Sequence, residues 1–420
     1  MREMKDSGIE WIGKVPVEWK IDNPQYHFSQ RKDRAKQGMV QLTASQKYGV
    51  ITQTEYMERT GANIVTVQKD FDILKLVCAG DFVIHMRSFQ GGLEYSEKTG
   101  SISSAYVMLI PSNTIREPRY YKWFFKSSNY IDALSSTSNL VRDGQAMRWS
   151  NFIQLPILFP PAEEQQRIAD FLDAKCAEID ALTADIQTQI DTLEQYKRSV
   201  ITETVTKGLN PDAKMKDSGI QWIGNMPAHW DVIRGKYILR YMQKPVREDD
   251  GVITCFRDGE VTLRSNRRED GFTMSDKEIG YQGIDVGDLV VHGMDGFAGS
   301  IGISNSRGKA SPVLNVLDTD QCKRYIMYYL RSMAYSDVFL ALATGIRVRS
   351  CDLRWNKLAE LSYPVPPLDE QNAIVKHIDS VLSKADAVIA DKKAQLANLD
   401  EYKKSLIFEY VTGKKEVPVS

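Results

Sequence analysis

The sequence lacks the features that mark membrane, secreted and disulfide-linked proteins. No run of 18 apolar residues occurs, so a membrane-spanning helix is excluded. The first residues, Met1 to Asp6, lack the apolar stretch of a signal peptide, so none is expected. The five cysteines are scattered and never spaced as C-x-x-C, which argues against disulfides or a structural zinc site and favours a reducing cytoplasm.

Catalytic motifs are also missing. No G-x-x-x-x-G-K-[ST] phosphate loop occurs, so a built-in translocation motor is excluded. The Pro-Pro pairs at 160–161 and 366–367 lack the flanking residues of a DNA-amine methyltransferase. The five histidines are not at metal-ligand spacing, and the fragments Glu18-Trp-Lys20 and Glu401-Tyr-Lys403 match a nuclease pattern only at chance level. We therefore predict no catalytic residue, no metal ligand and no enzyme activity for this chain.

The sequence also lacks an excess of basic over acidic side chains. The 420 residues carry 54 basic and 55 acidic side chains, a net charge of −1, which does not by itself suggest a nucleic-acid binder. Hydrophobic residues make up 42% and charged residues 26%, as in ordinary globular proteins. The length indicates two to four domains.

What the sequence does contain is an internal duplication. Residues 4–13, MKDSGIEWIG, return as MKDSGIQWIG at 215–224, with nine of ten positions identical. A Pro-x-x-Trp follows in each copy, and a Pro-Pro-x-x-Glu-Gln element at 160–165 returns at 366–371. The middles between these anchors diverge. A shared frame with different interiors predicts one scaffold that presents two different surfaces; duplication followed by plain drift is the alternative.

Each copy divides into two parts. The first holds short β-type runs broken by Gly and Asn with a few helical stretches, which is typical of an α+β globule. The second starts at the Pro-Pro pair and continues without Gly or Pro, which predicts a long helix. The predicted domains are 1–155, 156–213, 214–362 and 363–420, alternately globular and helical.

Each predicted helix is roughly 65 Å long and has an apolar stripe at steps of four and three along the sequence. We expect it to pair with the other copy's helix as an antiparallel coiled coil; packing along a globule is the alternative. Gln189 and Gln395 fall at equivalent positions and would fix the register. The predicted seam comprises Leu172, Ile179, Leu182, Ile186, Gln189 and Leu193 in the first helix and Ile378, Val381, Val388, Gln395 and Leu399 in the second.

Cutting the chain at the repeats reveals a charge pattern. The globular parts 1–155 and 214–362 have net charges of +4 and +2, whereas the helical parts 156–213 and 363–420 have −6 and −1. Acidic helices are repelled by DNA, so we expect them to face protein.

Polar, basic and aromatic loops in the globules are the candidate DNA contacts. Gln and Arg side chains pair bidentately with adenine and guanine edges. The candidates are Gln46, Lys47, Tyr48, Arg87, Ser88 and Gln90 in the first copy and Arg257, Arg264, Arg267, Arg268, Asp295 and Arg347 in the second. Each of them could instead be an ordinary surface side chain, and Arg87 could be a structural ion-pair partner.

The Trp-Ile-Gly…Pro-x-x-Trp opening, the Pro-Pro-x-x-Glu-Gln helix start and the doubled layout together resemble the specificity subunit of type I restriction-modification enzymes. The resemblance covers essentially the whole chain. It implies two similar target recognition domains, each reading one half of a split, asymmetric site on double-stranded DNA. It also implies that the two halves of the chain are an internal pseudo-two-fold duplication. The paired helices would then set the length of the spacer between the half-sites.

The same resemblance implies partners and cofactors. Two modification subunits would bring S-adenosylmethionine and methylate adenine, and restriction subunits would use ATP and Mg to translocate and cleave DNA. The chain itself would bind none of these cofactors and would work in the cytoplasm. Two alternatives remain: a stand-alone DNA-modifying enzyme, and a coiled-coil scaffold without DNA contact.

Overall fold

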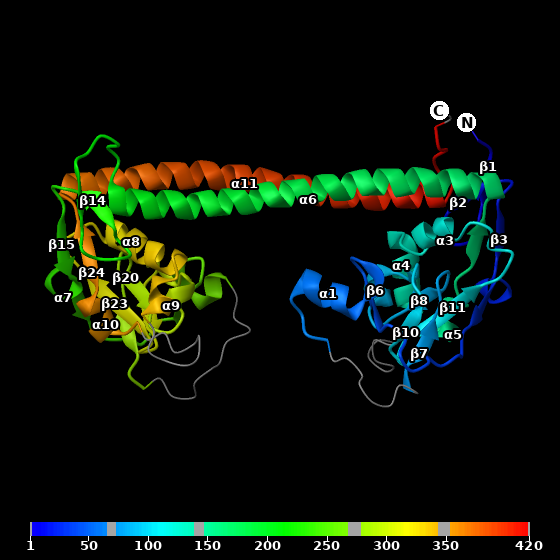
Figure 1. Cartoon of the computed structure of the whole chain (residues 1–420), viewed down its shortest axis with the longest axis horizontal. Helices are drawn as coiled ribbons and strands as arrows, with labels where there is room; N and C mark the ends of the chain where they lie inside the picture. Colours follow the sequence, from blue (N-terminus) through cyan, green and yellow to red (C-terminus); the bar gives the residue numbers. More distant parts are fainter. Residues whose placement is uncertain (1, 65–72, 138–146, 268–278, 343–352, 419–420) are drawn as a thin grey trace. The chain divides into compact units, whose positions relative to one another are not determined.

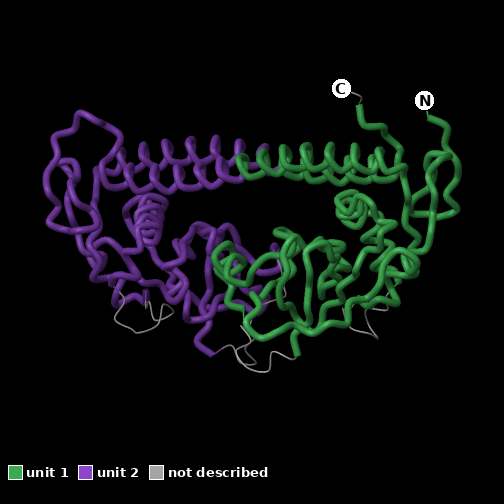
Figure 2. The backbone as a smooth tube through the Cα atoms, turned by 45° about the vertical axis from the view of Figure 1, so that its right-hand side comes forward, with its two compact units in different colours: residues 1–186, 394–420 green, residues 187–393 purple. Residues whose placement is uncertain are grey.

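The computed structural model describes residues 2–64, 73–137, 147–267, 279–342 and 353–418. The chain forms two compact units, residues 1–186 with 394–420, and residues 187–393 (Figure 2). Two long helices, α6 (Ala162–Lys207) and α11 (Leu368–Val411), each contribute one segment to each unit. Among the described residues, no helix is long and apolar enough to cross a membrane.

The first unit contains an antiparallel four-stranded sheet with the order β4 (Phe28–Gln30), β11 (Val107–Pro111), β8 (Phe82–Ile84), β9 (Glu94–Tyr95). The described residues of this unit also form two-stranded ladders: β1 (Met4–Asp6) with β2 (Lys14–Pro16), β3 (Lys20–Asp22) with β12 (Ile157–Phe159), β5 (Leu42–Ser45) with β6 (Gly49–Thr52), and β7 (Lys75–Val77) with β10 (Gly100–Ile102). The helices are α1 (Gln53–Thr60), α2 (Ser88–Gly91), α3 (Pro118–Phe124), α4 (Ser128–Ser136) and α5 (Trp149–Phe152) (Figure 1).

The second unit repeats this plan. Its sheet has the order β16 (Arg240–Met242), β23 (Leu314–Asp318), β20 (Leu289–His292), β21 (Ile301–Ile303). Its ladders are β13 (Met215–Asp217) with β14 (Asn225–Pro227), β15 (Asp231–Arg234) with β24 (Ser362–Val365), β17 (Ile253–Cys255) with β18 (Val261–Leu263), and β19 (Gln282–Ile284) with β22 (Gly308–Ala310). Its helices are α7 (Gly235–Ile238), α8 (Lys323–Tyr335), α9 (Val338–Ala341) and α10 (Trp355–Glu360). The predicted α+β class and duplication are confirmed.

An aromatic helix joins each globule to a long helix. Tyr120 of α3 is fully buried, and its hydroxyl donates to the backbone oxygen of Val411 at 2.7 Å. In the second unit the hydroxyl of Tyr325, on α8, donates to the backbone oxygen of Val205 at 3.0 Å. Buried tyrosine hydroxyls need a partner, so the end of the other copy's helix completes each core.

The duplicated motifs form the roots of the long helices. At the start, the Gln165 amide donates to the Pro160 carbonyl at 2.8 Å, and Gln371 donates to Pro366 at 2.9 Å. At the end, Gly208 lies in the left-handed region (φ +72°), as helix-terminating glycines commonly do. A Cβ on Gly208 would lie 3.1 Å from the Trp230 ring, so glycine also permits this close packing.

Strands β12 and β24 bear on the predicted domain limits. Both precede a long helix, and both pair with a strand of their own globule, β3 and β15. The limits proposed after residues 155 and 362 would separate these strands from their ladders.

In each unit, the segments of α6 and α11 pack antiparallel. Phe171 contacts Tyr410 with 4.5 Å between ring centroids in the first unit, where Asp180 also pairs with Lys403. Burial follows a heptad pattern with steps of four and three. Its members are Leu172, Cys176, Ile179, Thr183, Ile186, Ile190, Leu193 and Lys197 in α6, and Ile378, Leu382, Ala385, Ile389, Lys392, Leu396, Leu399 and Lys403 in α11.

Five of the eleven predicted seam positions lie one residue away from the buried heptad: Leu182, Gln189, Val381, Val388 and Gln395. Leu182 and Val388 are 46% and 44% exposed, whereas their neighbours Thr183 and Ile389 are half-buried and buried. Val381 is half-buried beside the true position, Leu382.

The predicted register role of the two glutamines was also wrong. Gln189 and Gln395 are exposed and lie outside the buried heptad positions. The side chain of Lys392, which is a heptad position, instead reaches Gln189 and donates a hydrogen bond to its amide oxygen.

Candidate nucleic-acid interface

The first unit has an open hollow of about 670 Å³ at the turn between β5 and β6. Four predicted contact residues, Gln46, Lys47, Tyr48 and Arg87, line it together. The rest of the wall includes Thr43 of β5, Tyr56, Arg59 and Thr60 of α1, His85 and Met86 after β8, and Tyr106 just before β11. Two predicted groups of DNA contacts that are far apart in the sequence, residues 46–48 and Arg87, therefore lie together in one hollow.

Positive charge and aromatic surface dominate this hollow. Lys47 and Arg59 each lie 5.2 Å from the centroid of the Tyr48 ring. Arg87 is exposed, and its guanidinium makes no hydrogen bond or ion pair with any residue that the structure describes. No carboxylate is among the described lining residues. Cations beside an aromatic face suit a nucleic-acid backbone and base edges.

Local signals explain how α1 places Arg59 in the wall. Thr52 caps the helix by accepting the Glu55 amide, and the Glu55 carboxylate accepts the Thr52 amide in return. Lys98 also donates to Glu55, and these hydrogen bonds lower the pKa of Glu55 to about 2. Gly61 ends the helix in the left-handed conformation. This T-x-x-E…G pattern could have revealed the helix, and with it Tyr56 and Arg59, which the sequence analysis missed.

Two predicted contacts of the first copy do not belong to this hollow. Ser88 is fully buried, and its hydroxyl accepts the His85 amide at 2.9 Å, so its assignment as a DNA contact is corrected. Gln90 lines a different hollow, of about 630 Å³, with Lys126 and with Lys404 of α11. The reason is local: residues 88–91 form one helical turn, on which Ser88 and Gln90 are two positions apart and therefore face nearly opposite sides.

The second unit has an open hollow of about 560 Å³ in the corresponding place, between the β17–β18 hairpin and the end of β20. Four predicted contacts, Arg257, Arg264, Arg267 and Asp295, line it. Arg268 and Arg347 lie outside the described residues, so the structure does not bear on them.

The charges of the second hollow are largely paired. Arg257 lies 3.1 Å from Asp295, and Arg267 lies 2.7 Å from Asp258. The Arg267 guanidinium also lies 4.1 Å from the centroid of the Phe256 ring. This hollow therefore offers carboxylate acceptors as well as guanidinium donors, unlike the first.

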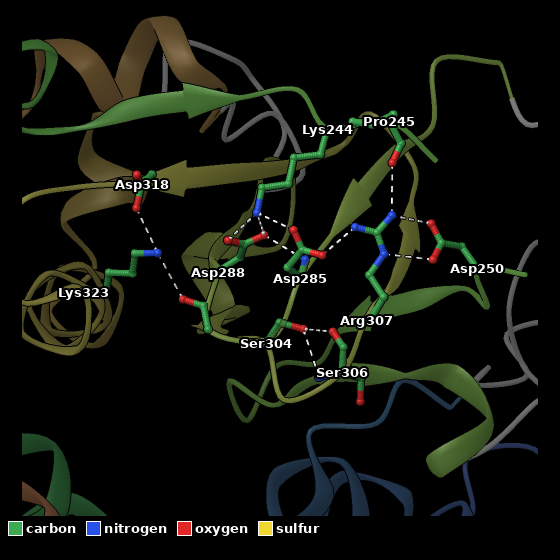
Figure 3. Close-up of polar contacts among 11 residues, drawn as sticks. Lys244, Pro245, Asp250, Asp285, Asp288, Ser304, Ser306, Arg307, Asp318 and Lys323 are labelled. Atoms are coloured by element: carbon green, nitrogen blue, oxygen red, sulfur yellow. Dashed lines mark hydrogen bonds and ion pairs between the residues drawn. The ribbon is translucent and has the colours of Figure 1, made fainter. Parts of the chain in front are cut away.

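A network of ion pairs anchors the hairpin that carries the second hollow (Figure 3). Arg307 holds Asp250, just before the hairpin, at 2.8 Å, and Asp285 at 2.6 Å. Lys244 lies 2.8 Å from Asp285 and 2.7 Å from Asp288. Hydrogen bonds from Lys244 and Arg307 lower the pKa of Asp285 to about 2. The ion pairs of Arg307 thus connect Asp250, just before the β17–β18 hairpin, to Asp285 in the turn before β20.

Comparisons with known proteins point to one family. A model described as the type I restriction modification DNA specificity domain matches residues 27–192, which cover most of the first globule and much of α6. The type I restriction enzyme MjaVIII specificity subunit of Methanocaldococcus jannaschii is 22% identical over 96% of this chain and 94% of its own length. This chain is similar to the specificity subunits of type I restriction enzymes. The recognition made from the sequence motifs is confirmed.

Other specificity subunits are similar over shorter spans. The EcoBI specificity subunit of Escherichia coli is 22% identical over 71% of this chain and 67% of its own length. Among solved structures, a chain from work on complex assembly and conformational transition of the type I R-M system aligns with a TM-score of 0.66. That alignment covers 96% of this chain and 99% of the other at 14% identity, so it supports the fold.

Proposed function

We propose that this specificity subunit reads a split, asymmetric sequence on double-stranded DNA, with one globule reading each half-site. The observation that carries the proposal is the pair of corresponding hollows. Both lie between a two-stranded hairpin and the end of an inner sheet strand, yet their linings differ in residue type and charge. One frame with two different linings is what a reader of two different half-sites requires.

The linings support different base preferences. In the first hollow, the Arg87 guanidinium, which has no partner among the described residues, could donate to the O6 and N7 atoms of guanine. In the second, Asp295 could accept from the N4 amine of cytosine while Arg257 contacts a base or phosphate. Both hollows are small compared with a DNA duplex, so we expect each to surround only the edges of a few base pairs.

The partners and cofactors follow from the same proposal. Two modification subunits would bind the duplicated frame, one per copy, and would carry S-adenosylmethionine for adenine methylation. Restriction subunits would add ATP and Mg. The acidic composition of the helical parts supports a role in binding protein rather than DNA. The subunit itself would bind no cofactor, catalyse nothing and work in the cytoplasm.

Selection from a pool of random DNA duplexes tests this function. The full chain, assembled with its modification subunits, should enrich two separate sequence blocks with a fixed gap between them. Enrichment of one continuous block, or of no sequence, would contradict the two-reader proposal. Adding S-adenosylmethionine and DNA to the chain alone tests the enzyme alternative, and we expect no methylation.

A further inference from the structure

A histidine ends the inner sheet strand next to each hollow. His85 follows β8, and His292 is the last residue of β20, in equivalent positions of the duplicated frame. Each lines the hollow of its unit. The next few residues form the loop that carries Arg87 in the first unit and Asp295 in the second.

Both histidines bind the backbone of that loop with the same ring atom. His292 Nδ1 accepts the backbone N–H of Asp295 at 2.9 Å and that of Met294 at 3.2 Å. His85 Nδ1 accepts the backbone N–H of Arg87 at 3.3 Å. The middle parts of the two copies share few residues. The same histidine-to-backbone contact is nevertheless present in both, in two loops of different sequence.

The contact requires a neutral ring with its hydrogen on Nε2, because a protonated Nδ1 cannot accept. The surroundings favour that state for His292. Its burial lowers its pKa, Arg257 lowers it further, and only Asp295 opposes them. In the first unit, His85 Nε2 lies 3.5 Å from the Glu94 carboxylate.

The backbone contact also orders the side chains that line the second hollow. The loop residue held by His292 is Asp295, and Asp295 in turn holds Arg257 of the facing hairpin at 3.1 Å. Freeing the loop would therefore displace both groups at once. In the first unit, Gln46 holds the Arg87 carbonyl at 3.0 Å from the hairpin side, while His85 holds the Arg87 amide.

We propose that His292, and His85 in the first copy, are positioning residues that hold the base-reading loop in its binding conformation by accepting its backbone N–H groups at Nδ1. This inference rests on the proposed function of the hollows. Positioning matters for specificity because hydrogen bonds to base edges need fixed donor and acceptor directions, whereas contacts to phosphate tolerate more movement.

Two substitutions at one position separate the Nδ1 contact from the bulk of the ring. In His292→Asn, the side-chain Oδ1 takes the place of Nδ1 and can still accept. In His292→Leu, an apolar side chain fills the space and cannot accept. The full chain with its modification subunits is titrated with a duplex that carries the selected site and with a random duplex, at fixed salt.

We expect His292→Leu to lower the ratio of specific to random affinity by about tenfold or more, since a loop that has lost two backbone hydrogen bonds no longer presents Asp295 and Arg257 together. His292→Asn should keep the ratio within about threefold of wild type. Equal losses in both variants, or an unchanged ratio in His292→Leu, would overturn the proposal. If His292→Leu does not fold, His292→Gln, whose acceptor lies one bond farther out, replaces it with the same expectation.

Hydrogen exchange at the backbone amides of Met294 and Asp295 tests the positioning without DNA. Exchange should be faster in His292→Leu than in wild type and close to wild type in His292→Asn. Unchanged exchange in His292→Leu would overturn the positioning role. A wild-type chain that binds specific and random duplexes equally would contradict the proposed function instead, and the exchange result would still decide the role of His292.

Discussion

Lys197 of α6 and Asp386 of α11 form an ion pair within the second unit, with 2.6 Å between Nζ and Oδ1. Lys403 and Asp180 repeat this pair in the first unit at 2.5 Å, with the helices exchanged. Burial lowers the pKa of Lys197, but its hydrogen bonds to Asp386 and Glu194 outweigh that effect and raise it. Lys197 in the second unit and Lys403 in the first therefore occupy seam positions, and an aspartate on the facing helix neutralises the charge of each.

The Lys197–Asp386 pair should contribute only modestly to stability, because Asp386 is 59% exposed and water screens the attraction. In a double-mutant cycle with Lys197→Met and Asp386→Asn, we expect a coupling free energy of about 0.5 kcal/mol. Urea unfolding of the four proteins measures it. The exposed pair Lys175–Glu178, which lies within α6 alone, is the control and should give less. A coupling of zero would mean that the pair does not bind the helices together.

The arginine that lines the first hollow should act on specificity and not on stability. Arg87→Ala should relax recognition at one base pair by about 1–3 kcal/mol, while the thermal midpoint stays near wild type, because the guanidinium has no protein partner among the described residues.

Arg119→Ala is the matched control for Arg87→Ala. Arg119 pairs with Glu117 and Asp170, at 2.9 Å and 2.7 Å, so its loss should lower the melting temperature and leave base preference intact. Titration with specific and random duplexes, beside a melting curve, compares the two. Equal weakening on both duplexes by Arg87→Ala, with a lowered melting temperature, would remove Arg87 from the base contacts.

The network around Arg307 should make the second unit sensitive to acid. The pKa values of Asp250 and Asp285 are lowered, chiefly by hydrogen bonds from Arg307 and Lys244. For a carboxyl with a lowered folded-state pKa, the added stability is present above the unfolded value near 4 and is lost as the pH falls toward about 2. Arg307→Met should therefore destabilise the second unit at pH 7, by about 2–3 kcal/mol, and by roughly half as much at pH 3, where part of the carboxyl charge is already lost. Urea unfolding at both pH values checks this; an equal loss at both would show that packing, not charge, accounts for it.

The long helices should set the distance between half-sites. One heptad inserted after Ile186 in α6 and one after Lys393 in α11 keeps the seam in phase and lengthens each helix by about 10 Å. We expect unchanged half-sites with a spacer longer by about three base pairs. Sequencing methylated adenines in cells that carry the variant measures the spacer. Inserting a heptad in only one helix is the control and should abolish activity. An unchanged spacer with full activity would contradict a ruler role.

The sequence predicted the architecture because its duplicated ends carry strong local signals: the Pro-Pro helix starts, the closing glycines and the apolar heptads. The predicted seam positions Leu182 and Gln189 continue from Ile168 in steps of seven, one residue out of phase with the buried heptad. Near the helix roots the globule and the partner helix together bury a wider stripe, and both Ile168 and Ala169 are buried there. Only Ala169 lies on the heptad that continues to Cys176 and Thr183. A single sequence does not show whether an apolar residue of a long helix is buried by the globule or by the partner helix.

The hollows were predicted in part. Residues next to a strand end, such as Arg87 and Asp295, could be picked out from local pattern. Arg59 and Thr254 reach the same hollows only through tertiary packing of α1 and the β17–β18 hairpin. Ser88 and Gln90 were misplaced because a single helical turn, α2, sends one side chain into the core and the other toward α11.

Exchange of one globule tests the central claim most directly. Residues 20–154, from β3 to the end of the first middle, are replaced by the equivalent segment of a specificity subunit with a known, different site, while β12 and both long helices are kept. Methylated adenines are then mapped in cells that carry the variant and its modification subunits. The account predicts that one half-site changes to that of the donor, while the other half-site and the spacer remain as before. A variant that methylates but changes both half-sites, or neither, would contradict the assignment of one globule to one half-site.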